Sequence, residues 1–166
     1  MPRGTRTRGE AGRTGTPGQQ LAGFIGRFEP PIGRLVRAAR AALGKRFPTA
    51  NQLVYDNYNA LAIGFSSTDR VADVLVSLAV YPRGVNLYFM YGARLPDPHH
   101  VLKGSGSQGR FIPLESVAML ERPAVAALMG AAVRQARTPL GKRVRGRLLI
   151  KSVSKKQRPR RPVAAA

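Results

Sequence analysis

Residues 74–92, VLVSLAVYPRGVNLYFMYG, contain the strongest β-strand pattern of the chain and decide its fold class. VLVSLAVY (74–81) and VNLYFMYG (85–92) are rich in the β-branched, aromatic and aliphatic residues that strands favour. The turn formers between them, residues 82–84, are typical of a short hairpin connection. Both faces of 74–81 are apolar, which predicts a central strand covered on two sides, or one that lines a cavity.

Further strands are expected on both sides of this hairpin. Residues 52–66 hold two short strand-like runs, and in the second a bulky face, formed by Leu61, Ile63 and Phe65, alternates with a small one. Residues 109–114 and 147–154 also have strand patterns. The sequence therefore predicts a sheet built around the central hairpin.

Helices are predicted before and after these strands. Apolar residues at helical spacing over 32–43 follow Pro30 and Pro31, and a basic face lies opposite, formed by Arg34, Arg37, Arg40 and Lys45. Pro123 begins a second helical pattern that extends to residue 137.

The predicted fold is α+β: one small domain with an N-terminal helix, a mostly antiparallel sheet of about five strands, and C-terminal helices. We expect this domain to span residues 23–154. Residues 1–22 and 155–166 have few aliphatic side chains and are predicted to be disordered basic tails.

Charge is the most unusual feature of the composition. The 166 residues include 28 Lys and Arg but only 8 Asp and Glu, a net charge of +20. The chain has no Cys, which excludes disulfide scaffolds, thiolate metal sites and cysteine nucleophiles. It also has no signal-peptide pattern and no apolar run long enough to span a membrane. A cytoplasmic protein without a membrane partner is expected.

Residues 138–166 hold ten basic residues and no acidic one. Such a segment suits binding to nucleic acid or to an acidic protein, through counterion release. The predicted nucleic-acid contacts are Lys142, Arg143, Arg145, Lys155, Lys156, Arg158, Arg160 and Arg161. The alternative is that these charges only keep the protein soluble. In either case residues 155–166 are expected to be dispensable for folding.

Several motifs together resemble a known family. VYDNYNALAIGF (54–65), LAVYPRGVNLYFMYGARLPDPHH (78–100) and RPAVAALMGAAVRQA (122–136) are similar to the bacterial YdhG-like family, domain of unknown function 1801, over about residues 30–154. The resemblance implies a small cytoplasmic α+β domain without a settled activity, and no catalytic residues to transfer. A bacterial relative is described as a frataxin-like iron chaperone, but this sequence lacks an acidic ridge for iron.

The glycine-rich loop GSGSQG (104–109) is a candidate anion site. It matches G-x-G-x-x-G, but no strand precedes it and no helix follows, so a dinucleotide fold is not predicted. Lys103, Ser105, Arg110 and the loop N–H groups are predicted to form an anion-binding nest. The alternative is a flexible, solvated loop.

A second set of candidate ligand-binding residues combines aromatic rings with charge: Tyr55, Asp56, Tyr58 and Arg83. The alternative is that the rings belong to the core. His99 and His100 are adjacent, so they rarely bind one metal together, and no metal, cofactor or catalytic residue is predicted. The resulting hypothesis is a non-enzymatic module that binds a small anion. The alternatives are nucleic-acid or acidic-partner binding through the tails, and an iron chaperone by family resemblance.

Overall fold

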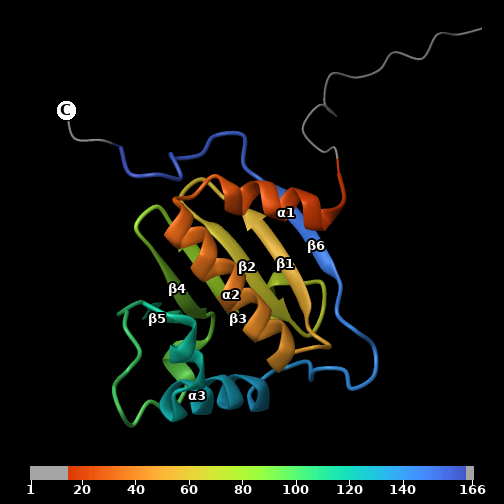
Figure 1. The fold of residues 1–166 in the computed structure, drawn as a ribbon. Helices are drawn as coiled ribbons and strands as arrows, with labels where there is room; N and C mark the ends of the chain where they lie inside the picture. Colours follow the sequence, from red (N-terminus) through yellow and green to blue (C-terminus); the bar gives the residue numbers. More distant parts are fainter. Residues whose placement is uncertain (1–14, 164–166) are drawn as a thin grey trace, which may run out of the picture.

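A computed structural model describes residues 15–163 of the chain. Its sheet has six strands in the order β5-β4-β3-β2-β1-β6 (Figure 1). The strands are β1 (Asn51–Asp56), β2 (Leu61–Ser66), β3 (Val74–Tyr81), β4 (Gly84–Phe89), β5 (Arg110–Leu114) and β6 (Leu148–Val153). β3 lies inside the sheet between β2 and β4, as its two apolar faces predicted.

The fold is α+β as predicted, but its sheet has six strands rather than about five and is mixed, since one of its five strand pairings is parallel. β1 to β5 pair antiparallel, but β6 joins the free edge of β1 in parallel, with Gln52 opposite Leu148. The chain leaves the last helix at the end of the sheet where β1 begins, so β6 enters from that end (Figure 1).

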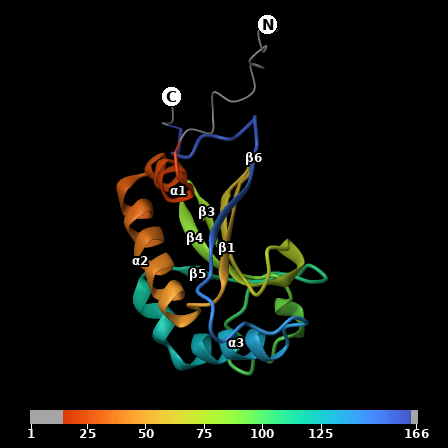
Figure 2. The ribbon, with the colours of Figure 1, turned by 90° about the vertical axis from the view of Figure 1, so that its right-hand side faces the viewer.

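The helices cover one face and one end of the sheet. α2 (Pro30–Arg46) lies along one face, and α3 (Pro123–Arg134) crosses the end of the sheet (Figure 2). Between α2 and the sheet, facing strands contribute bulky rows such as Ile63, Leu78 and Leu87, all without solvent exposure. α1 (Pro17–Gly26) packs beside β6.

Part of the predicted N-terminal tail is helical. α1 begins at Pro17 with a capping box, in which Thr16 Oγ1 accepts a hydrogen bond from the N–H of Gln19 at 3.2 Å. Leu21 and Ile25 anchor the helix in the core, with 1% and 3% exposure. Two buried residues one turn apart are enough to hold this helix against the surface that the rest of the domain provides. The folded domain therefore starts before residue 23. Residues 1–14 lie outside the described part of the chain.

The predicted C-terminal tail also packs on the domain. Beyond β6, the N–H of Arg158 donates to the carbonyl of Tyr58 at 2.9 Å, and Arg160 is only 3% exposed. The prediction of a disordered segment is therefore wrong for residues up to 161. The segment is fixed by polar contacts and not by an apolar stripe, which is why composition did not reveal it. Residues 164–166 are outside the described range.

Candidate functional site

The seven predicted ligand-binding residues fall into two groups at opposite ends of the sheet. Tyr55, Asp56 and Tyr58 lie at or just after the end of β1, at the same end as Arg83 in the β3–β4 turn. Lys103, Ser105 and Arg110 lie at the other end, where Arg110 pairs with Phe89 at the end of β4. The structure therefore does not bring the two groups into one site.

Arg110 closes the glycine-rich loop on itself. Its Nη1 donates hydrogen bonds to the carbonyls of Gly106 and Gly109, at 2.6 and 2.7 Å. Lys103 pairs with Phe111 through the backbone, while the side chains of Lys103 and Ser105 are exposed. The arginine thus supports the loop, and anion binding here stays a prediction.

Asp56 is not available to a ligand, contrary to prediction. Its side chain is 1% exposed, and its Oδ1 accepts a hydrogen bond from Arg160 Nη2 at 2.8 Å. Arg27 Nη1 lies 3.5 Å from its other oxygen. Arg160 is also 1% exposed, donates to the carbonyl of Asn57, and lies over the Phe28 ring at 5.8 Å. A fully enclosed ion pair of this kind is structural.

The same contacts also correct the list of residues predicted to bind nucleic acid. Arg160 is buried and cannot reach a phosphate. Arg158 lies over the Tyr58 ring, at 5.5 Å from its centre, and remains exposed together with Lys155, Lys156 and Arg161. These residues follow β6, whereas the exposed Lys142, Arg143 and Arg145 precede it, at the opposite end of the sheet.

Tyr55, the residue before Asp56 on β1, is also partly enclosed. Burial raises the pKa of its hydroxyl above the usual value.

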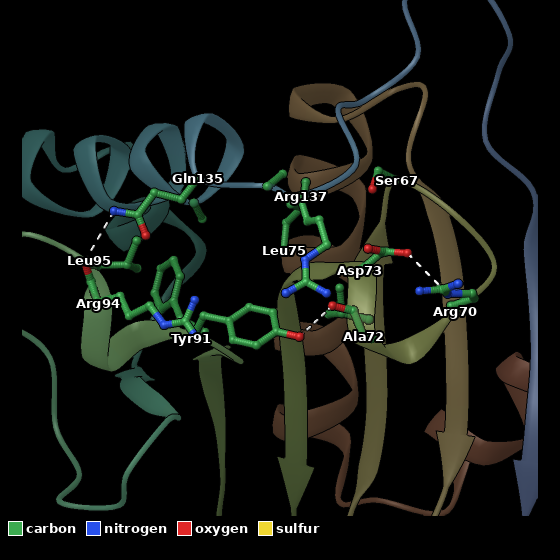
Figure 3. Close-up of a pocket in the computed structure, with 14 residues that line it drawn as sticks. Ser67, Arg70, Ala72, Asp73, Leu75, Tyr91, Arg94, Leu95, Gln135 and Arg137 are labelled. Atoms are coloured by element: carbon green, nitrogen blue, oxygen red, sulfur yellow. Dashed lines mark hydrogen bonds and ion pairs between the residues drawn. The ribbon is translucent and has the colours of Figure 1, made fainter.

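The best-formed pocket lies at the end of the sheet covered by α3 (Figure 3). Its walls come from the β2–β3 connection, the start of β3, the end of β4, a short turn at Gly92–Arg94, and the C-terminal end of α3. Its volume is about 150 Å³. A cavity of about that size takes a benzene-sized molecule.

Three arginines and one aspartate give this pocket its charge. Arg70, Arg94 and Arg137 line it with Asp73, so cations outnumber the carboxylate by two. Asp73 is held by Thr68, whose hydroxyl donates at 2.7 Å, and by Arg70, whose Nε lies 3.6 Å away. Within residues 15–163, Arg94 and Arg137 form no ion pair with a carboxylate. In Figure 3 the guanidinium of Arg137 points into the middle of the pocket.

Tyr91 helps to hold Arg94 in place at the wall of the pocket. Its hydroxyl donates to the carbonyl of Ala72 at 2.7 Å, and Arg94 lies over its ring, 5.5 Å from the centre. Gln135 donates to the carbonyl of Arg94 at 3.2 Å and ties α3 to the same turn. These contacts hold Arg94, which is exposed, at the rim of the pocket.

The remaining lining combines apolar surface with one hydroxyl. Val74, Leu75, Phe89 and Leu95 form the apolar wall, together with Ala132 and Ala136. Ser67 Oγ is buried and has no hydrogen-bond partner among the described residues. An apolar wall with a few converging polar groups is the usual make-up of a small-ligand site.

Sequence reasoning missed this pocket because its charged residues are scattered from Arg70 to Arg137, in stretches of ordinary composition. The pair Arg70 and Asp73 was visible only as part of a polar loop, and Tyr91 only as a strand aromatic. No short motif contains Arg137 and Arg94. The nearest signal was that both faces of β3 are apolar, which left open a strand covered on two sides or one that lines a cavity.

Comparison with protein-family models, with curated proteins and with solved structures finds no match to this chain. In the described part of the chain, no helix has the length and apolar character needed to cross a membrane. No group of three His, Asp or Glu side chains in residues 15–163 is placed to hold a metal ion.

Proposed function

We propose that this protein binds a small organic carboxylate in the pocket beside Arg70, Arg94 and Arg137. The excess of two cations over the single carboxylate Asp73, in a pocket with an apolar wall, carries the proposal. The hypothesis of a small-anion module is thereby retained, but its site moves from the glycine-rich loop to this pocket.

Size and chemistry narrow the ligand class. About 150 Å³ suits a ligand with a body the size of one benzene ring, whereas a complete nucleotide would extend out of the pocket into solvent. Arginine presents a planar fork of donors that matches a carboxylate in two contacts. The orphan hydroxyl of Ser67 adds a group that can donate to an oxygen of the ligand.

Calorimetry with benzoate, and with benzyl alcohol as an uncharged analogue, tests the proposal. We expect benzoate to bind and benzyl alcohol to bind at least tenfold more weakly, because charge-assisted hydrogen bonds contribute about 1.5–3 kcal/mol. Arg137→Met should lower benzoate affinity by about tenfold or more. Equal affinity for the two compounds, or no binding of either, would overturn the proposal.

Arg134 supplies the matched control. It lies one turn before Arg137 at the end of α3, is exposed, and does not line the pocket. Arg134→Met removes the same charge from nearly the same place, so it should leave benzoate affinity within about twofold. A similar loss in both variants would show that only net charge matters.

The YdhG-like resemblance remains a prediction and names no ligand of its own. An iron-chaperone role has no observation in its favour, since the described acidic residues include two buried ones, Asp56 and Asp73, that are already paired with arginine.

A further inference from the structure

A second concave surface lies between α2 and the segment that leads into β6. Its volume is about 500 Å³, and it is open to solvent. Four of its lining residues are basic and none is acidic: Arg37, Arg40, Lys45 and Arg145. We call this surface the basic groove. It joins the basic face of α2 to a residue 100 positions later, and it shares no lining residue with the carboxylate pocket.

Gly146 allows the segment that leads into β6 to lie close to the chain that follows α2. Its N–H donates to the carbonyl of Pro48 at 3.0 Å, and Arg147 N–H donates to Asn51 Oδ1 at 2.9 Å. A Cβ at position 146 would overlap the carbonyl of Ala50, so only glycine allows this close approach. The neighbouring Arg145 is thereby held against the C-terminal half of α2.

One cation of the groove is fixed in place. Arg40 Nε donates to Gln52 Oε1 on β1 at 2.7 Å, and no carboxylate of residues 15–163 forms an ion pair with it. Burial lowers the pKa of this guanidinium below its usual value, so the site is already partly desolvated. A fixed, partly desolvated cation without a counter-charge favours an anion from outside.

We propose that the basic groove binds the phosphate backbone of double-stranded nucleic acid. Arg37 and Lys45 are eight positions apart on α2, or about 12 Å along the helix axis. This distance spans about three to four phosphate steps of one strand, at about 3.4 Å each. Lys142 and Arg143, exposed on the same segment as Arg145, extend the charge beyond the groove.

The lining favours a duplex over a single strand or an acidic protein. Phe47 is the aromatic residue among the lining residues, and it is only 5% exposed. Binding to single strands depends on exposed rings on which bases stack, and such rings are absent from this lining. Three cations along one helix suit successive phosphates of a duplex backbone, and backbone contacts alone predict binding without sequence preference.

The experiment compares two triple variants of the full chain with equal net charge. The groove variant is Arg37→Gln, Lys45→Gln and Arg145→Gln, all exposed side chains without hydrogen bonds to other described side chains. The control variant is Arg122→Gln, Arg134→Gln and Lys151→Gln, three exposed residues that lie outside the groove. Fluorescence anisotropy with a labelled 20-base-pair duplex is measured from 50 to 200 mM salt.

We expect the groove variant to lose duplex affinity about tenfold or more. The slope of log affinity against log salt should become shallower by about 2.7, because each phosphate contact contributes about 0.9. The control variant should keep most of its affinity and slope. Lys45→Glu alone, a single exposed change, provides a second variant, and thermal melts of each protein confirm folding.

Other outcomes overturn the proposal. An equal loss in the two triple variants would show that net charge, not the groove, attracts the duplex. Groove-dependent binding of polyglutamate, with duplex binding unchanged, would assign the surface to an acidic protein. Benzoate binding should be the same in the groove variant and in the wild type, so failure of this proposal is distinguishable from failure of the carboxylate pocket.

Discussion

Asp56 and Asp73 are both buried and both face an arginine, yet their surroundings differ. The partner of Asp56, Arg160, is 1% exposed, whereas the partner of Asp73, Arg70, is 70% exposed. The first pair encloses both charges and fastens the C-terminal segment to the domain. The second leaves a guanidinium at the rim of a pocket with two further arginines. Because both carboxylates are buried, the difference lies in the exposure of the partner arginine. An enclosed arginine forms a structural pair, whereas an exposed one is free to contact the proposed ligand.

The largest effect is expected from removing the partner of Asp56 with its whole segment. Truncation after Ser154 leaves a buried carboxylate without Arg160, which costs about 3–5 kcal/mol of unfolding free energy. For a domain of this size the melting temperature should fall by roughly 6–20 °C. This expectation replaces the sequence-based one that residues 155–166 are dispensable for folding.

Truncation after Arg161 is the control for that experiment. It keeps the ion pair and removes only residues 162–166, so the melting temperature should stay within about 2 °C of the wild type. If both truncations melt alike, the C-terminal segment does not hold the domain together.

Arg160→Met isolates the ion pair from the rest of the segment. It should lower the unfolding free energy in urea by about 3 kcal/mol, since the enclosed Asp56 then loses its buried partner and keeps only Arg27, 3.5 Å from its other oxygen. Adding Asp56→Leu should restore most of the loss, because two apolar residues often replace a buried pair at little cost. A double variant that loses the sum of both single effects would show that the two charges are not coupled.

The smallest effect on stability is expected at the other pair. Arg70→Ala should change the unfolding free energy by less than about 1 kcal/mol, because the guanidinium is mostly in solvent. It should still weaken benzoate binding, since Arg70 lines the pocket. A loss of stability as large as that of Arg160→Met would erase the distinction between the pairs.

The elements that could be predicted from sequence are those with a regular apolar pattern. The hairpin of β3 and β4, the two short strands before it, and the amphipathic α2 all follow from spacing along a few turns or strands. α1 was missed because its first turn holds only Pro, Gly and Gln, and its three bulky apolar residues, Leu21, Phe24 and Ile25, are too few to predict a helix until they have a surface to pack on.

The sites could not be predicted because they depend on contacts between distant segments. Asp56 and Arg160 are 104 positions apart, and sequence assigned one to a ligand site and the other to a nucleic-acid site. The pocket requires α3 to end beside the turn of Arg94, and the basic groove requires Gly146 to reach Pro48. Residue types alone predicted an affinity for anions, but only the packing shows which cations lie together.

The parallel strand β6 has a consequence for how the chain acquires its structure during synthesis. Asn51 and Arg147, which join β1 to the approach of β6, are 96 positions apart. Pairing over such a separation is slow, because a long loop must close before any contact forms. Until residues 148–153 leave the ribosome, one edge of β1 has unpaired N–H and C=O groups and is open to other chains. The cations that flank β6 and α2 repel the same cations on a second unfinished copy, so we expect the net charge to oppose edge-to-edge pairing of two such sheets.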